Sequence, residues 1–372
     1  MEKYSDYLYA KASHQRIPLG GAFELSPVCN FACKMCYVRK TPAQIRAEGK
    51  RQLDWQEWVS LAEQCHKAGT LFLLLTGGEP FLYPHFRELY IQLHKMGFLL
   101  SINTNGTLID EATIAWLKEY APHRVNITLY GGSEQTYERI CGSASGYHRA
   151  VAAIRGLKEA GIPVVINASM IPENAGDQEA ILQFGKDLGL NVRMATYMFP
   201  PSRRETEKTD SRFTPEEAAA MFVHKAKFLQ HSQDYVRWLS SQVAEEKVQE
   251  GNDWGNHRED YMQCRAGRSS FWISWDGTMT ACGIMPFPLQ LYPFLEPFAD
   301  CWNKLTDVVR TTPVLSGCKN CPRRKLCKPC VAMIYTETGT PDQKAPYLCA
   351  MAQCAQDMMR KELEVIKCEK AE

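Results

Sequence analysis

The stretch Cys29-Asn30-Phe31-Ala32-Cys33-Lys34-Met35-Cys36 carries three thiols within eight residues. Their C-x3-C-x2-C spacing allows all three to face one metal centre. A [4Fe–4S] cluster takes four thiolates, so three alone predict an iron with one open coordination position. A zinc site completed by His14 or His66 is the alternative that this spacing leaves open.

Around this stretch, apolar runs of strand length alternate with helical patterns. Asp54, followed three residues later by Glu57, predicts a capping box at the start of one helix. Strands are predicted over 22–26, 71–75, 98–103, 125–130, 162–170 and 191–196, with helices over about 54–69, 85–96, 110–117, 147–160 and 178–188. This alternation predicts a parallel α/β structure, with its site at the C-terminal ends of the strands. The periodicity is compatible with both an open doubly wound sheet and a partial barrel.

Polar and glycine-rich segments follow several of these strands. They are Thr76-Gly77-Gly78-Glu79-Pro80, Asn103-Thr104-Asn105-Gly106 and Tyr130-Gly131-Gly132. A cysteine triad followed by Gly-Gly-Glu-Pro at the next strand end resembles the radical S-adenosylmethionine (SAM) enzymes. That resemblance implies a partial (β/α)6 TIM-like barrel over residues 1–200, in which the open iron binds the amino and carboxylate groups of SAM.

The resemblance also implies which side chains contact SAM. The segment Gly77, Gly78, Glu79 and Pro80 corresponds to the stretch that hydrogen-bonds the SAM amino group, and Thr128 stands where relatives place a serine that contacts the ribose. Asn103, Asn105 and Asn167, on neighbouring strands, are expected to face the nucleoside. Met35 departs from the family, which usually has an aromatic residue before the last cysteine.

The composition changes after residue 200. We expect a helical linker over 201–260, in which Thr214-Pro215-Glu216-Glu217 starts a helix that runs towards Ala244. Beyond it, 269–274 and 279–282 predict short strands around an Asp276-Gly277 hairpin turn.

The last third, 261–372, holds a second group of cysteines. Cys264-x12-Gly277-x4-Cys282 is followed by Cys318-x2-Cys321-x5-Cys327-x2-Cys330, and later by Cys349 and Cys354. On its own, the run from Cys318 to Cys330 would also suit a treble-clef or zinc-ribbon site. Behind the first motif, the pattern resembles the SPASM extension of radical SAM enzymes, which holds two auxiliary [4Fe–4S] clusters.

The SPASM resemblance implies a ligand set for each auxiliary cluster. Cys264, Cys282 and Cys330 would hold the first cluster, and Cys318, Cys321, Cys327 and Cys349 the second. The usual upstream fourth ligand of the first cluster is missing, which leaves an open iron or an unusual ligand from Cys354, Cys301 or His257. With the triad, the implied cofactors are SAM and three [4Fe–4S] clusters.

Composition excludes several classes of protein. Fifteen cysteines in 372 residues, without an apolar signal segment at the start, indicate metal ligation in a reducing compartment, so we expect a cytoplasmic protein. A net charge of +1 gives no reason to expect a nucleic-acid partner. The sequence has no apolar run of about 18 residues, so no membrane span is expected.

The resemblance implies reductive cleavage of SAM to a 5′-deoxyadenosyl radical, which abstracts hydrogen from a substrate. We expect a maturase that acts on a ribosomally made peptide, by oxidation or by thioether or C–C crosslinking. A small-molecule dehydrogenase is the alternative. A sulfatase maturase is disfavoured, because Gly283 replaces the aspartate that serves there as base. Outside this class stand a zinc-binding interaction protein and a two-electron SAM methyltransferase.

Partners and an acid–base group are less defined. Fewer than 30 residues precede the triad, so leader recognition would need a separate protein or the 201–260 segment. A flavodoxin or ferredoxin would supply the electron. The sequence identifies no catalytic acid or base, although Glu24, His85, Asp276 and Arg204 are candidates at the barrel mouth.

Overall fold

The computed structural model describes residues 4–200, 211–244, 261–262, 264–318, 321–327 and 330–369. One eight-stranded sheet organises this part of the chain, in the order β6-β5-β4-β3-β2-β1-β7-β8. The strands are β1 (Gly20–Glu24), β2 (Phe72–Thr76), β3 (Leu99–Thr104), β4 (Arg124–Thr128), β5 (Val164–Ser169), β6 (Asn191–Ala195), β7 (Ser270–Ile273) and β8 (Met279–Thr280).

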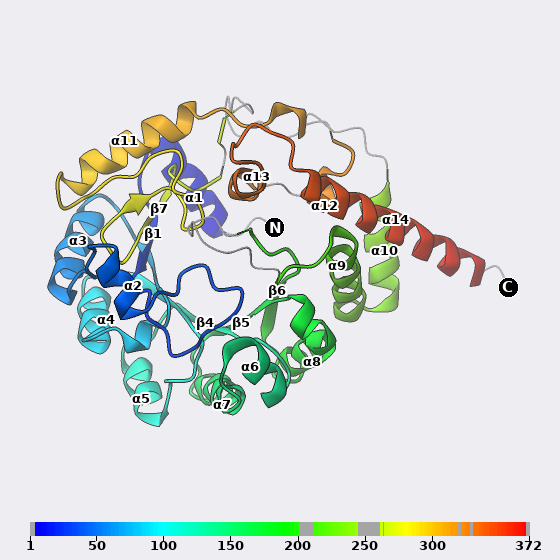
Figure 1. Cartoon of the computed structure of the whole chain (residues 1–372), viewed down its shortest axis with the longest axis horizontal. Coiled ribbons are helices and arrows are strands. Elements are labelled where there is room, and N and C mark those ends of the chain that lie inside the picture. Colours follow the sequence, from blue (N-terminus) through cyan, green and yellow to red (C-terminus); the bar gives the residue numbers. More distant parts are fainter. Residues whose placement is uncertain are drawn as a thin grey trace.

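Strands β1 to β6 are parallel and neighbour one another in chain order. The sheet curves into a partial barrel with helices on its outer side (Figure 1). The predicted (β/α)6 arrangement is therefore confirmed. The helices of this half are α1 (Tyr4–Gln15), α2 (Pro42–Ala47), α3 (Trp55–Lys67), α4 (Phe86–Lys95), α5 (Glu111–Glu119), α6 (Glu134–Cys141), α7 (Gly146–Glu159) and α8 (Gln178–Asp187), with 3-10 turns at Pro80–Leu82 and Pro172–Asp177.

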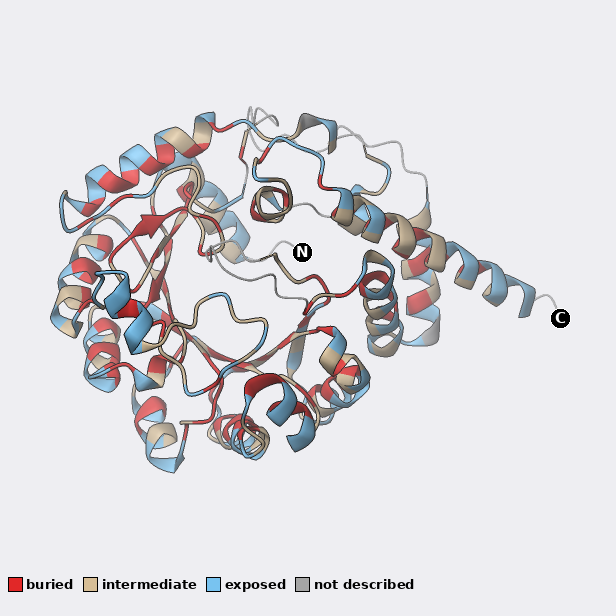
Figure 2. Ribbon diagram, in the orientation of Figure 1, coloured by how far each residue is buried: buried red, intermediate tan, exposed pale blue. Residues whose placement is uncertain are grey.

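The core lies between the sheet and its outer helices. Leu75, Ile102, Val125, Ile127 and Ile166 point outward and are fully buried. Figure 2 shows the same division, with buried strands and with helices buried on their inner side only. Since side chains alternate along a strand, the other set of residues faces the barrel interior, and there the strands carry polar side chains.

Helix boundaries follow the capping signals. Asp54 accepts a hydrogen bond from the Glu57 amide at 2.8 Å, and the Glu57 carboxylate accepts one from the Asp54 amide at 2.9 Å, so the predicted capping box is confirmed. The single helix predicted from Thr214 towards Ala244 is wrong. It is two helices, α9 (Pro215–Leu229) and α10 (Ser232–Val243), because Gln230 and His231 adopt extended backbone angles.

The C-terminal part joins the same sheet. Strand β7 pairs in parallel with β1, and β8 returns antiparallel to β7 across a turn where Gly277 has φ +86°. The predicted Asp276-Gly277 hairpin is thus confirmed. The remaining helices are α11 (Phe298–Thr311), α12 (Arg324–Cys327), α13 (Val331–Thr338) and α14 (Pro346–Glu369), with a 3-10 turn at Ser316–Cys318.

A polar junction fastens α13 and α14 to the end of the barrel. Glu337 accepts hydrogen bonds from Tyr197 at 2.8 Å and from Arg212 at 2.7 Å. The Arg212 guanidinium also lies 3.8 Å from the ring centroid of Tyr347. The arginine, the carboxylate and the aromatic rings therefore hold the C-terminal helices against the segment that follows β6.

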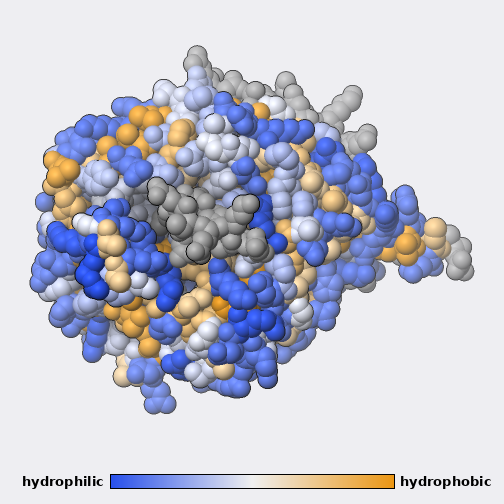
Figure 3. Space-filling model, in the orientation of Figure 1, coloured by the Kyte–Doolittle hydropathy of each residue, from blue (hydrophilic) through white to orange (hydrophobic). Residues whose placement is uncertain are grey.

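No helix in the described ranges is long and apolar enough to cross a membrane. Hydrophilic residues dominate the face shown in Figure 3, and hydrophobic residues appear there in scattered groups.

We expect Glu337→Ala to destabilise the protein by about 2 kcal/mol, because Arg212 and Tyr197 would lose their shared acceptor at a mostly buried position. Glu364→Ala, at an exposed position of α14, is the control and should change stability by no more than about 0.5 kcal/mol. Equilibrium denaturation measures both. Equal effects of the two substitutions would contradict this role of Glu337.

Candidate functional site

The ends of the first three strands are joined by a buried polar network. Glu79, which is fully buried after β2, accepts hydrogen bonds from the Thr104 hydroxyl at 2.7 Å and the Asn105 amide at 2.8 Å. Asn105 then donates to Asn30 at 2.9 Å and to the Cys29 sulfur at 3.7 Å. The network therefore positions the cysteine loop over the strand ends.

The two glycines after β2 let that strand approach the cysteine loop. The Gly78 amide donates to the Ser26 carbonyl at 2.6 Å, and the Glu79 amide to the Val28 carbonyl at 2.9 Å. A Cβ on Gly77 or Gly78 would lie 2.3 Å from the Ser26 or the Val28 carbonyl oxygen. Any larger residue would force the cysteine loop away from the strand.

The three thiols of the triad are neighbours. Burial raises the pKa of Cys29 to about 12, and the charges of Glu79, Cys33 and Cys36 add to this rise. Three thiols that repel one another in this way form a donor set that a cation would stabilise. The residues present therefore fit an iron–sulfur cluster held by three cysteines.

Cys33 has two side-chain partners that sequence reasoning did not find. Cys141, at the end of α6, and Tyr130, after β4, hydrogen-bond to Cys33 and lower its pKa despite burial. The Ala32 and Lys34 amides donate to the carbonyls of Cys141 and Ile140 at 3.0 and 3.1 Å. The end of α6 thus fixes the middle of the cysteine loop on both sides of Cys33.

The side chains predicted to contact SAM gather at the strand ends. Asn103 accepts from Asn126 at 2.8 Å, and Thr128 and Asn167 are register partners on β4 and β5. Both oxygens of Glu79 are occupied by donors of the chain, so its observed role is structural, as is that of Asn105. Direct contacts of these residues with SAM stay a prediction.

The C-terminal cysteines lie in two groups. Burial raises the pKa of Cys264 to about 11, and the neighbouring Cys330 and Cys282 contribute to this rise. Burial also raises the pKa of Cys327 to about 11, with contributions from Cys349, Cys318 and Cys321. These thiols are therefore electrostatic neighbours within each group, and the two ligand sets stay a prediction.

The sequence named three candidate extra ligands for the first C-terminal group. Cys354 packs on α14 against the helices α9 and α10. Cys301 is fully buried in α11, where it interacts with Glu296. His257 lies outside the described residues, as does Arg204. The fourth ligand for Cys264, Cys282 and Cys330 stays a prediction.

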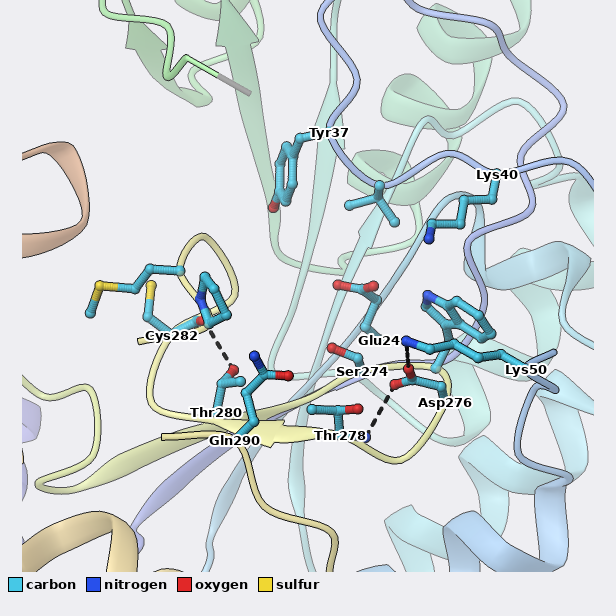
Figure 4. A pocket seen from close by; sticks show the side chains of 14 residues that line it. Glu24, Tyr37, Lys40, Lys50, Ser274, Asp276, Thr278, Thr280, Cys282 and Gln290 are labelled. Carbon is cyan, nitrogen blue, oxygen red and sulfur yellow. Dashed lines mark hydrogen bonds and ion pairs between the residues drawn. The ribbon is translucent and has the colours of Figure 1, made fainter. Parts of the chain in front are cut away.

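A cavity of about 420 Å³ separates the cysteine loop from the β7–β8 hairpin (Figure 4). Tyr37, next to the triad, reaches it from one side and Cys282 from the other. Glu24, at the end of β1, faces the cavity and accepts from the Trp272 indole at 3.1 Å. Lys50 and Asp276 form an ion pair of 2.6 Å along its wall. Lys50 also lies 5.8 Å from the ring centroid of Trp275.

Residues 23–185 match the model of the radical SAM superfamily. This range holds the triad, the Gly-Gly-Glu-Pro segment, the end of β1 and the strands β2 to β5. These residues form a radical SAM domain. Its cofactors are SAM and the iron–sulfur cluster of that superfamily, and the predicted recognition is confirmed.

Relatives extend the similarity beyond the radical SAM domain. The chain is 24% identical over 338 residues to the AdoMet-dependent heme synthase of Methanosarcina barkeri, covering 88% of this chain and 95% of that protein. It is 29% identical over 202 residues to the PqqA peptide cyclase of Ruegeria pomeroyi, covering 51% of this chain and 53% of that one.

A solved structure shares the fold over nearly the whole chain. Streptococcus suis SuiB, bound to its precursor peptide SuiA, has a TM-score of 0.65 at 17% identity and covers 93% of this chain and 80% of that one. The similarity includes the part after the radical SAM domain. The predicted fold class, a radical SAM core followed by a SPASM-type cysteine-rich region, is therefore confirmed.

A pH test follows from the buried carboxyl of the network. Burial raises the pKa of Glu79 from its ordinary 4.5 to about 7. Between these values the folded protein keeps a proton that the unfolded chain has released, so stability should fall as the pH rises from about 4.5 to about 7. Glu79→Gln, which mimics the protonated form, should lack this part of the pH dependence.

Chemical denaturation of the metal-free protein at a series of pH values measures it. Glu63→Gln, on the exposed face of α3, is the control and should keep the wild-type profile. An unchanged profile in Glu79→Gln would show that Glu79 is already ionised in the folded state over this range.

Proposed function

We propose that this chain is a radical SAM enzyme that removes hydrogen from a peptide substrate, leading to oxidation or to a thioether or C–C crosslink. The observation that carries the proposal is the cavity bounded by Tyr37, beside the triad, and by Cys282, of the first C-terminal cysteine group. A substrate held there would lie between the site where SAM is cleaved and a second metal centre.

The triad Cys29, Cys33 and Cys36 would hold the SAM-binding cluster. When this cluster is bound, it supplies the electron for reductive cleavage of SAM. The chain positions that group through the Glu79 and Asn105 network. Gly77 and Gly78 bring the strand end close, and the remaining predicted contacts, Pro80, Asn103, Thr128 and Asn167, surround the same strand ends. A flavodoxin or ferredoxin is the proposed electron donor.

Two further [4Fe–4S] clusters are proposed for the C-terminal part. Cys318, Cys321, Cys327 and Cys349 supply four thiols, enough for a complete ligand set. Cys264, Cys282 and Cys330 supply three, so the first auxiliary cluster would keep one iron open beside the cavity. Such an iron could bind the substrate or accept its electron.

Relatives support a peptide as substrate. The name of PqqA peptide cyclase refers to a peptide, and the solved structure of SuiB is bound to its precursor peptide SuiA. A separate leader-recognition protein is proposed to assist. A sulfatase-maturase role is disfavoured, because a Cβ on Gly283 would lie 2.6 Å from the Trp272 ring and leaves no room for the base.

A small-molecule substrate is the second candidate. The specific observation is the heme synthase relative, which this chain covers almost completely. The cavity would then receive a small organic molecule in place of a peptide segment.

Anaerobic reconstitution tests the cofactor part of the proposal. We expect roughly twelve irons per chain and formation of 5′-deoxyadenosine when dithionite and SAM are added. Cys29→Ala/Cys33→Ala/Cys36→Ala should keep roughly eight irons and form no 5′-deoxyadenosine. Bound zinc without a visible chromophore would point to the interaction-protein alternative. A methyl product without 5′-deoxyadenosine would point to a methyltransferase.

Co-expression tests the substrate class. A short peptide encoded next to this gene is expressed with the wild-type chain and with the triad variant. We expect the peptide to lose mass in pairs of hydrogen atoms only with the wild type. Unchanged peptides, together with oxidation of a small-molecule acid by the reconstituted enzyme, would favour the second candidate.

A further inference from the structure

The interior of the barrel contains a chamber that extends past the predicted SAM contacts Asn103 and Asn167. Its volume is about 640 Å³, which is in the range of pockets that bind small organic ligands. Tyr37 and Cys282 line both this chamber and the cavity of Figure 4. The chamber extends from there down to Tyr9 of α1, beneath the strands.

Strand register explains why the chamber wall is polar. Ile102, Val125, Ile127, Ile166 and Met194 point outward into the core. Their sequence neighbours therefore point inward. These inward residues are Ser101, Asn103, Arg124, Asn126, Asn167 and Arg193, and all of them line the chamber.

Two of these side chains are the cations Arg124 and Arg193. Neither Arg124 nor Arg193 has a carboxylate within ion-pair distance in the described part of the chain, and the Nε atom of Arg124 is buried without a hydrogen-bond partner there. Burial lowers the pKa of Arg124, and the positive charge of Arg193 lowers it further. The third arginine on the wall, Arg265, is paired with Asp6 at 2.6 Å.

Other groups around the pair do not neutralise it. Burial and the charge of Arg124 both lower the pKa of His123, so that ring favours its neutral form. Asn126 is almost fully buried, and its Oδ1 atom accepts no hydrogen bond from the described residues. The wall thus offers two guanidinium groups and one amide acceptor to whatever enters.

We propose that Arg124 and Arg193 form a carboxylate-binding site inside the barrel. A guanidinium presents a planar set of donors that matches a carboxylate. Arg124 is partly buried and Arg193 is exposed, and two neighbouring cations that repel each other are stabilised by an anion between them. The Asn126 oxygen would accept a hydrogen bond from an N–H or O–H group of the same ligand. Either an acidic side chain or a free C-terminus of a peptide supplies this chemistry.

Calorimetric titration of the reconstituted full-length protein, without SAM or reductant, tests the site. The probes are Ac-Glu-NH2, its uncharged isostere Ac-Gln-NH2, and N-acetylglycine, which carries a terminal carboxylate. We expect saturable binding of Ac-Glu-NH2 or of N-acetylglycine. The uncharged Ac-Gln-NH2 should not bind. Whichever of the two binds more tightly identifies the side chain or the terminus as the source.

Arg124→Gln and Arg193→Gln should each weaken that binding at least about tenfold, which corresponds to about 1.4 kcal/mol. Arg155→Gln is the matched control, because Arg155 lies over the Phe184 ring, away from the chamber wall. Iron content and thermal unfolding show whether each variant is folded.

The proposal would be overturned if neither carboxylate probe bound saturably, or if Ac-Gln-NH2 bound as tightly as Ac-Glu-NH2. It would also be overturned if a protein carrying both Arg124→Gln and Arg193→Gln bound the probe as the wild type does. Loss of probe binding on saturation with SAM would also overturn it, since the arginines would then hold the carboxylate of SAM. The measurement needs no turnover, so failure of the proposed radical reaction leaves it interpretable.

Discussion

The hydrogen bonds of the buried Glu79 carboxylate are the constraint on which the site depends. Its oxygens join the end of β2 to Thr104 and Asn105 at the end of β3, and Asn105 passes the connection on to Asn30 in the cysteine loop. Each strand is held in the sheet by main-chain hydrogen bonds to its neighbouring strands, but the loop between β1 and α2 is not part of the sheet. These side-chain hydrogen bonds, together with the main-chain bonds to the end of β2 and to the end of α6, therefore decide where the three thiols lie.

The shared sheet imposes a second constraint. Because β7 pairs with β1, the hairpin that carries Cys282 is a continuation of the barrel and is fixed relative to β1 by main-chain hydrogen bonds. Glu24 and Trp272 contact each other across the same pair of strands. The position of Cys282 relative to the first cysteine loop is consequently set in part by backbone pairing.

The polar interior distinguishes this barrel from one whose interior is packed with branched apolar side chains. Asparagines on β3, β4 and β5 and arginines on β4 and β6 face inward, while the largest apolar cluster of the barrel lies between the sheet and its helices. A barrel built in this way gains little stability from its interior. It keeps that space available for a cofactor and a ligand.

The sequence by itself determined the six strand–helix alternations, the Asp54 cap, the Asp276-Gly277 hairpin and the radical SAM resemblance. These are local signals, written in spacing and periodicity. The break between α9 and α10 left no such signal, and the single long helix expected there was wrong. Only the tertiary structure brought Cys141 and Tyr130 to Cys33, joined β7 to β1, and placed Arg124 and Arg193 on one chamber wall. Those contacts join residues from about seventy to several hundred positions apart, and they depend on strand register and helix docking, which no short stretch of residues encodes.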